Sequence, residues 1–185
     1  LKAGDILFLS GSLPGSLHGD FYGRIMDIAS ENGATVILDA GGNALLQGVS
    51  HEPYLVKPNH YELGEIYGKE LQTVEEVIPY GQKLQDAGAK NVLISLAGAG
   101  AVLLTENGQV IRANAPQGVV KNAVGAGDAM LAGFMVGIIN SGSFFTALQL
   151  AVATGSASAF SEAFATMEEI DRILPMVKCE LVKTV

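Results

Sequence analysis

Short apolar runs alternate with helical segments through the first half of the chain, and this alternation restricts the fold more than any other feature. Several of the runs are apolar throughout, as in strands that are buried on both faces of a sheet. Strands that alternate with helices are connected by those helices and run parallel. We therefore expect an α/β fold with strands at residues 6–9, 35–38, 54–56 and 91–96 and helices at 20–31, 60–67 and 73–86.

The pattern changes after residue 100. Two strand-like runs, 101–105 and 109–113, flank Asn107-Gly108, and Asn-Gly between two strands indicates a tight hairpin. The rest of the chain predicts three helices and a last strand, at 129–140, 144–160, 166–174 and 178–185. No repeat or linker interrupts the chain, and its length suits one domain. We expect a mostly parallel sheet flanked by helices, with an antiparallel hairpin at one edge.

Composition excludes several classes of partner. The chain has 11 Lys and Arg against 19 Asp and Glu, a net charge of −8, which would repel nucleic acid and anionic lipid. Its 49% apolar residues and 16% charged residues exclude a disordered chain. The single cysteine, Cys179, excludes an intrachain disulfide and a cysteine-rich zinc site, and it fits a reducing cytoplasm.

The N-terminal region shows no targeting signal, since Leu1–Ser10 lacks the pattern of a signal peptide. The longest apolar region, 129–139, is too short to cross a bilayer and predicts a buried helix. The chain begins without Met and reaches its first expected strand within a few residues. This favours a fragment whose upstream part is missing, with a processed mature chain as the alternative.

The sequence from Asn122 to Asp128 is the sharpest local feature. Gly125 and Gly127 come just before the apolar helix expected at 129–140. Glycine N–H groups and a helix N-terminus together bind anions. Asp128 would lie beside that anion, where it could take a proton from an attacking hydroxyl group. The alternative is that Asp128 caps the helix.

A second motif is Lys57-Pro58-Asn59-His60-Tyr61-Glu62. It follows a buried strand, and ligands of open α/β sheets bind at such carboxyl ends. Asn59 and Glu62 are one helical turn apart and share a face. An amide and a carboxylate there suit a hydrated Mg²⁺ ion. A helix cap with a capping-box Glu explains the same residues equally well.

Two further turns follow expected strands. The segment 95–100, Ser-Leu-Ala-Gly-Ala-Gly, could hold phosphate with backbone N–H groups, or it could be a plain glycine-rich turn. It is neither a Walker A motif nor a dinucleotide fingerprint. The segment 10–14, Ser-Gly-Ser-Leu-Pro, is small and polar and could hold a substrate hydroxyl or phosphate. The histidines show no metal-ligand spacing and are expected at the surface or in caps: His18, His51 and His60.

Each signal is weak alone, but their order along the chain is specific. That order, 10–14, 57–62, 95–100 and then Gly-Ala-Gly-Asp at 125–128, resembles the PfkB (ribokinase-like) sugar kinase family over nearly all 185 residues. Within the family, the fructose-1-phosphate kinases (1-phosphofructokinases) are the most similar, at 55–64, 125–134 and 153–162. The resemblance implies a ribokinase-like α/β fold and a cytoplasmic kinase that converts fructose 1-phosphate to fructose 1,6-bisphosphate. A tagatose-6-phosphate kinase, or another phosphosugar kinase, is the alternative.

The resemblance also implies a role for each motif, with ATP, Mg²⁺ and a monovalent cation as cofactors. Asp128 would be the catalytic base and would contact the acceptor, with an anion hole formed by Gly125, Ala126 and Gly127. Asn59 and Glu62 would organise Mg²⁺ and the phosphates. ATP would contact Lys57, Ser95, Leu96, Ala97, Gly98, Ala99, Gly100, Asn122, Ala153 and Ser156. The phosphosugar would bind near Ser10, Gly11 and Ser12.

Two departures from the family pattern matter. The upstream half is missing, with its lid strands and a substrate-binding aspartate, and Ala129 stands where relatives usually have Ser or Thr. We therefore interpret residues 1–185 as the C-terminal part of one kinase domain, inactive in isolation, with an exposed sheet edge at 6–9 through which copies could associate. A non-catalytic nucleotide-binding module is the alternative of another class. A hydride-transfer enzyme is excluded, since no strand–Gly-x-Gly-x-x-Gly–helix unit exists.

Overall fold

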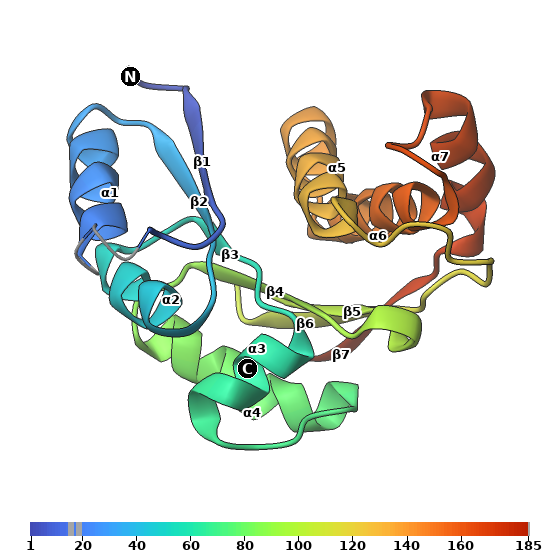
Figure 1. The fold of residues 1–185 in the computed structure, drawn as a ribbon, viewed down its shortest axis with the longest axis horizontal. Coiled ribbons are helices and arrows are strands. Elements are labelled where there is room, and N and C mark those ends of the chain that lie inside the picture. The colour runs from blue at the N-terminus through green and yellow to red at the C-terminus, as the bar shows by residue number, and fades with distance from the viewer. Residues whose placement is uncertain (15–16, 18–19, 185) are drawn as a thin grey trace. The chain divides into compact units, whose positions relative to one another are not determined.

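The computed structural model describes residues 1–14, 17 and 20–184. The chain forms two compact units, Leu1–Ser95 with Leu104–Gly108, and Leu96–Leu103 with Gln109–Val185. Figure 1 labels the elements of both units and colours them along the chain from the N-terminus to the C-terminus. Gly15, His18 and Val185, which fell within expectations from the sequence, lie outside the described residues.

The first unit contains four strands that pair in chain order and all run parallel. They are β1 (Ile6–Ser10), β2 (Thr35–Asp39), β3 (Leu55–Val56) and β4 (Asn91–Ser95). The four predicted parallel strands are thus confirmed, with ends that shift by one residue. β1 is the first strand in this order, and within the described residues of the first unit it pairs with β2 alone.

Helices connect these strands, as the alternating pattern predicts: α1 (Phe21–Glu31), α2 (Gly42–Gly48), α3 (His60–Tyr67) and α4 (Val74–Asp86), with a short 3₁₀ turn η1 (Val49–His51). α1 and α2 lie next to each other, with α3 beside α4 (Figure 1). Capping boxes begin α3 at Asn59 and α4 at Thr73, which explains why their start was visible in the sequence. The pattern missed α2, because a short segment that begins and ends with glycine lacks a helical signature.

The core of the first unit is built from aliphatic side chains of both element types. Fully buried residues include Met26, Ile37, Leu38, Leu45, Leu55, Leu63, Leu84, Leu93 and Ile94. Burying one such side chain contributes about 1.5–3 kcal/mol. This core fixes the carboxyl ends of β1, β2 and β3 next to one another.

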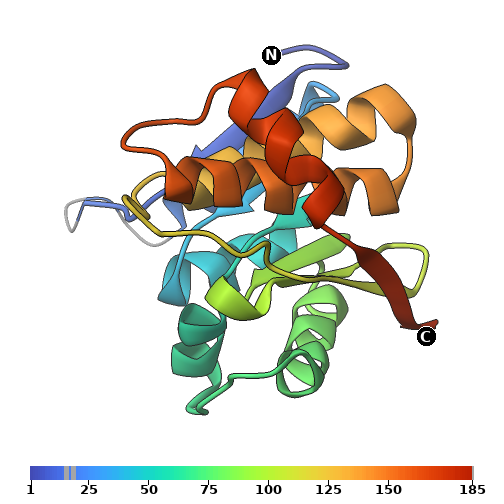
Figure 2. The same ribbon diagram turned by 90° about the vertical axis from the view of Figure 1, so that its right-hand side faces the viewer.

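The second unit contains three strands in the order β5 (Ala101–Leu104), β6 (Gln109–Ala113), β7 (Cys179–Thr184). The predicted hairpin is confirmed: the N–H of Gly108 donates to the carbonyl of Thr105 in the turn between β5 and β6. β7 pairs antiparallel with β6, with an irregularity between Val110 and Ile111. Figure 2 shows α7 leading into β7 near the C-terminus.

Three helices complete the second unit: α5 (Ala126–Ser141), α6 (Phe144–Phe160) and α7 (Met167–Ile173). α5 begins three residues before the predicted start at 129, while α6 has the predicted bounds. α5 and α6 pack closely because α5 carries glycine at the contact. A Cβ atom on Gly137 would lie 2.6 Å from the Cα of Ala147. Among the described residues, no helix has the length and apolar character needed to cross a membrane.

Candidate active site

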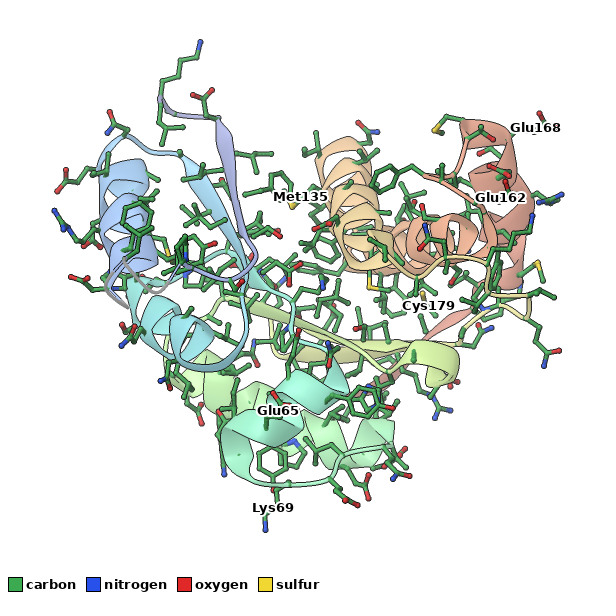
Figure 3. The ribbon with its side chains drawn as sticks, in the orientation of Figure 1. Glu65, Lys69, Met135, Glu162, Glu168 and Cys179 are labelled. Atoms are coloured by element: carbon green, nitrogen blue, oxygen red, sulfur yellow. The ribbon has the colours of Figure 1, made fainter. Side chains whose placement is uncertain are left out.

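Polar residues gather in the first unit at the carboxyl ends of its parallel strands. Ser10 ends β1, and Gly11 and Ser12 come directly after it. Asp39 ends β2, and Lys57 follows β3. Together with Glu62 and Glu65 of α3 they line a cavity of about 860 Å³. Figure 3 shows Glu65 on α3. Open α/β sheets bind their ligands at this end of the strands, so the cavity is a candidate substrate site.

Tyr22 of α1 holds the turn after β1. Its hydroxyl lies within hydrogen-bond distance of the carbonyl oxygens of Ser10 (2.9 Å) and Gly11 (3.1 Å). The N–H of Gly11 donates to the carbonyl of Asp39 at 2.9 Å, which ties the turn to β2 as well. Burial, and then the negative charge of Asp39, raise the pKa of Tyr22 above its ordinary value. The phenol therefore stays neutral and able to donate.

Asp39, which is half-buried, and Lys57, which is buried, form an ion pair in the lining of this cavity. The ammonium Nζ of Lys57 lies 3.2 Å from Oδ2 of Asp39, and the two side chains are 7% and 17% exposed. The sequence motif pointed to Lys57, whereas Asp39 and Tyr22 were missed. For Asp39 the signal was present, since it is a carboxylate that ends a buried parallel strand.

Asn59 and Glu62 form the capping box that the sequence offered as the alternative to a metal site. The side-chain oxygen of Asn59 accepts from the N–H of Glu62 at 2.9 Å, and Oε2 of Glu62 accepts from the N–H of Asn59 at 2.8 Å. Glu62 also lines the cavity. A carboxylate has two oxygens and an amide oxygen has two lone pairs, so the cap leaves further acceptor capacity on both side chains.

The segment 95–100 forms a tight turn after β4. Its centre is the 3₁₀ turn η2 (Ala97–Ala99), closed by the N–H of Leu96, which donates to the carbonyl of Gly100 at 2.8 Å. Ala97, Gly98 and Ala99 are exposed, Leu96 and Gly100 are buried, and Ser95 is half-buried. The segment therefore presents its central residues to solvent.

The second unit brings the glycine motif to the start of α5. Gly125 is the N-cap with φ +78°, a conformation that favours glycine, and no side chain caps the helix. The interpretation of Asp128 as a helix cap is therefore wrong. Asp128 is an exposed residue of the first turn, and Ala126 and Gly127, both half-buried, precede it in that turn. The N–H groups of this turn and the carboxylate lie together.

Asn122 organises the loop that leads into α5. Its side-chain oxygen accepts from the N–H of Val124 at 3.0 Å, and its side-chain amide donates to the carbonyl of Glu162 at 3.3 Å. Figure 3 shows Glu162 in the chain beyond α6. α6 also lies close to the start of α5, because a Cβ on Gly155 would be 3.0 Å from the carbonyl oxygen of Ala126. The second unit thus gathers Asn122, Gly125 and Asp128.

The two positions predicted on α6 differ in their accessibility. Ala153 is fully buried and Ser156 is half-buried. The Ser156 side chain is therefore accessible for a direct contact, whereas the Ala153 side chain is packed in the interior.

The two described histidines make contacts within the first unit. His51 pairs with Asp27 at 2.6 Å and is half-buried. His60 is buried, and its Nδ1 lies 3.3 Å from the carbonyl oxygen of Ser95. The expectation of a surface or capping position is therefore wrong for His60, since Asn59 caps α3. Within residues 1–14, 17 and 20–184, no cluster of three His, Cys, Asp or Glu side chains could hold a metal.

Comparison with known proteins adds to this geometry. Residues 1–170 match the model of the pfkB family carbohydrate kinases. The chain is 47% identical over 96% of its length to the 1-phosphofructokinase of Bacillus subtilis, and 40% identical over 96% to the D-tagatose-1-phosphate kinase of Bacillus licheniformis. It spans 58% and 59% of the length of these two relatives.

Solved structures give the same picture. A structure from Staphylococcus aureus matches all of this chain with a TM-score of 0.92 and 35% identity, over 60% of its own length. Phosphofructokinase-2 from Escherichia coli, solved with substrates and products, matches 95% of this chain with a TM-score of 0.86 and 28% identity, over 58% of its length. The ribokinase-like α/β fold expected from the sequence is confirmed.

Proposed function

The chain belongs to the pfkB family of carbohydrate kinases, and we propose that the protein carrying it transfers the γ-phosphoryl group of ATP to the free primary hydroxyl of fructose 1-phosphate. The product is fructose 1,6-bisphosphate. The observation that carries this proposal is the 47% identity to a 1-phosphofructokinase over 96% of the chain. Because the chain spans 58% of that relative's length, the activity is proposed for the complete protein.

Asp128 is the proposed catalytic base. Phosphoryl transfer depends mostly on positioning and on stabilising charge. The first turn of α5 supplies both, because its N–H groups at Gly125, Ala126 and Gly127 can meet phosphoryl oxygens and its exposed carboxylate can accept the proton of the acceptor hydroxyl. Ala129 is buried, so the absence of a hydroxyl at that position leaves the exposed face of the turn unchanged.

The acceptor is proposed to bind in the cavity of the first unit, near Ser10, Gly11 and Ser12. For the nucleotide we propose contacts along the turn 95–100, where three exposed residues present their backbone, and at Lys57, Asn122 and Ser156. Ala153, which is fully buried, supports this site by packing.

Mg²⁺ is proposed to bind near Glu62 and Asn59. The residues fit a hydrated ion, because Glu62 lines the cavity and uses one carboxylate oxygen in the cap, while Mg²⁺ usually keeps several waters and takes one or two carboxylates. When bound, the ion would neutralise charge on the phosphates. A monovalent cation is also proposed, since phosphofructokinase-2 from E. coli was solved with potassium.

A second acceptor is supported by a specific observation, the 40% identity to a D-tagatose-1-phosphate kinase. Turnover by the complete protein separates the candidates: fructose 1-phosphate, tagatose 1-phosphate, tagatose 6-phosphate and fructose 6-phosphate are offered in turn, and kcat/KM is compared. We expect fructose 1-phosphate to give the highest value. ATP binding without turnover of any of the four would favour a non-catalytic nucleotide-binding module.

We propose a cytoplasmic enzyme without nucleic-acid or membrane partners. The net charge of −8 supports the second point, because it would repel nucleic acid and anionic lipid. Association of copies is also proposed. Phosphofructokinase-2 from E. coli has been solved as a tetrameric inhibited form. Measuring the molar mass of the complete protein in solution would test whether the protein that carries this chain also forms oligomers.

A further inference from the structure

We propose that Asp39 is a positioning residue, which acts through Lys57 by holding the lysine ammonium at the cavity of the first unit. The inference rests on the proposed function for one point only. That point is the group that Lys57 meets in the cavity, which we take to be a phosphate of ATP. The contact itself is independent of that function. Neither the sequence motifs nor the family match assigns a role to Asp39.

Backbone geometry places the two side chains together. Ile37 and Leu38 of β2 are in register with Leu55 and Val56 of β3. The N–H of Lys57 continues this ladder by donating to the carbonyl of Leu38 at 3.3 Å. Asp39 and Lys57 are therefore the next residues on the two strands, and their side chains meet at 3.2 Å.

The burial of the pair argues for a role beyond stability. Lys57 is 6% exposed, and it is the one Lys or Arg among the buried polar residues of the described chain. The free energy of removing two charges from water is about as large as the free energy gained from their attraction. A well-packed pair of apolar side chains would therefore stabilise the fold equally well. The ion pair with Asp39 holds the charged end of the flexible lysine side chain in one place.

The surroundings explain why the anchor is needed. Besides Asp39, the cavity is lined by the carboxylates of Glu62 and Glu65, which could draw the ammonium to other positions. Asp39 is also tied to the turn after β1, because its carbonyl accepts from the N–H of Gly11 at 2.9 Å. One residue thus sets the position of both the acceptor turn and the lysine.

A double-mutant cycle in the full-length protein tests the inference through unfolding and through kinetics. The variants are Asp39→Asn, Lys57→Met and the double variant, with Glu180→Gln as the control. Glu180 forms an exposed ion pair with Arg112. Glu180→Gln, like Asp39→Asn, replaces the carboxylate of an ion pair by an amide, but it does so outside the cavity. Each single cavity variant should lower Tm on the order of 10 °C, and the double variant should regain much of this loss, since it leaves no unpaired buried charge.

The kinetic arm separates positioning from mere stability. Asp39→Asn should lower kcat/KM for ATP by about 10- to 100-fold, by analogy with the outer partners of metal ligands. Lys57→Met should lower it at least as much, because the lysine is the group that meets the phosphate. The KM for the sugar phosphate should stay unchanged. The double variant should be as slow as Lys57→Met alone, although it is the more stable protein. Glu180→Gln should keep wild-type kinetics.

Three results would overturn the inference. The first is additive changes in Tm, which would mean that the two side chains do not interact. The second is wild-type kinetics in Asp39→Asn. The third is a further loss of activity, with a raised Mg²⁺ requirement, when Asp39→Asn is added to Lys57→Met, because Asp39 would then act independently of the lysine. A wild-type protein that neither binds ATP nor phosphorylates a sugar phosphate overturns the proposed function instead, and coupled Tm values would still support the contact.

Discussion

At the scale of single residues, Asp128 carries the first prediction. Asp128→Asn in the full-length protein removes the proposed base but keeps the size of the side chain, and Gly125 still caps α5. The expected loss in kcat is about 10²- to 10⁴-fold, the usual contribution of a general base, with ATP affinity retained. Steady-state kinetics and calorimetric ATP titration measure the two quantities. Asp171→Asn, at an exposed position of α7, is the matched control, and a kcat within about threefold of wild type would remove Asp128 from the role.

Glu62 carries the second prediction, because the capping box allows its charge to be tested apart from its structural role. Glu62→Gln can still accept from the N–H of Asn59, since glutamine also serves in capping boxes. The Mg²⁺ concentration for half-maximal rate should rise, while Tm should change little. Glu76→Gln removes the same charge from the capping box of α4 and should leave the Mg²⁺ dependence unchanged. Equal Mg²⁺ titrations for Glu62→Gln and wild type would assign Glu62 to the helix cap alone.

Local sequence patterns found the residues that act through chain neighbours and missed those that act through space. Asn59 and Glu62 are three positions apart, so their cap was predictable, although the pattern could not separate it from a metal site. Tyr22 and Asp39 contact residues 12 and 18 positions away, Ser10 and Lys57. Such contacts depend on strand order and register, which no short motif encodes. His60 was misjudged for the same reason, because its burial depends on β4.

At the scale of elements, the sequence predicted type and order well, and ends less well. α6 has its predicted bounds, whereas α5 begins at Ala126 rather than 129. Glycine has a low helix propensity, which argues against a helix start at Ala126-Gly127. The helix nevertheless begins there, because Gly125 forms its N-cap. α2 was missed because its sequence, Gly-Asn-Ala-Leu-Leu-Gln-Gly, has too few turns to show a period.

The packing of α5 against α6 supplies a prediction on stability. Gly137→Ala should improve helix propensity by about 1 kcal/mol, but its Cβ would lie 2.6 Å from the Cα of Ala147, a backbone atom that cannot turn aside. The net effect should be a loss of about 1–3 kcal/mol in the free energy of unfolding, as for other overpacked cores. Urea unfolding measures it, with Asn140→Ala at an exposed position of the same helix as the control. A more stable Gly137→Ala variant would show that the two helices can move apart at little cost.

The capping boxes of α4 and α7 predict a dependence of stability on pH. Hydrogen bonds from the backbone N–H groups of Gln72 and Thr73 lower the pKa of Glu76 below 4.5, and those from Thr166 lower the pKa of Glu169. A lowered pKa in the folded state stabilises the fold above pH 4.5, and this contribution is lost as the pH falls through the lowered pKa. Glu76→Gln and Glu169→Gln should therefore be less stable than wild type at pH 7, and the difference should vanish in strong acid. Urea unfolding across that range measures it, and a difference that is constant with pH would contradict the assignment.

At the scale of the whole molecule, the share of its relatives that the chain spans leads to the last prediction. It spans 58% of the B. subtilis 1-phosphofructokinase. All the motifs proposed for the nucleotide, from Lys57 to Ser156, lie within it, whereas the proposed acceptor site has one small polar turn, Ser10–Ser12, and a cavity rich in carboxylates. A phosphosugar is an anion, and Lys57, the lysine that lines this cavity, is proposed to meet a phosphate of ATP instead. We therefore expect groups outside these residues to help hold the acceptor.

Residues 1–185 alone are accordingly expected to bind ATP weakly and not to phosphorylate fructose 1-phosphate. Holding both reactants in line lowers the activation free energy by about 7–11 kcal/mol. Most of this reduction is lost when the acceptor is not held in place. The isolated chain should also self-associate, because β1 pairs with β2 alone in the described part of the first unit and Phe8 on it is 44% exposed. Free strand edges with apolar side chains recruit other strands. A coupled kinase assay and light scattering on one purified sample measure both properties. Turnover like that of the full-length enzyme would mean that these residues hold the acceptor by themselves. A monodisperse monomer would mean that the edge of β1 does not pair with other copies of the chain.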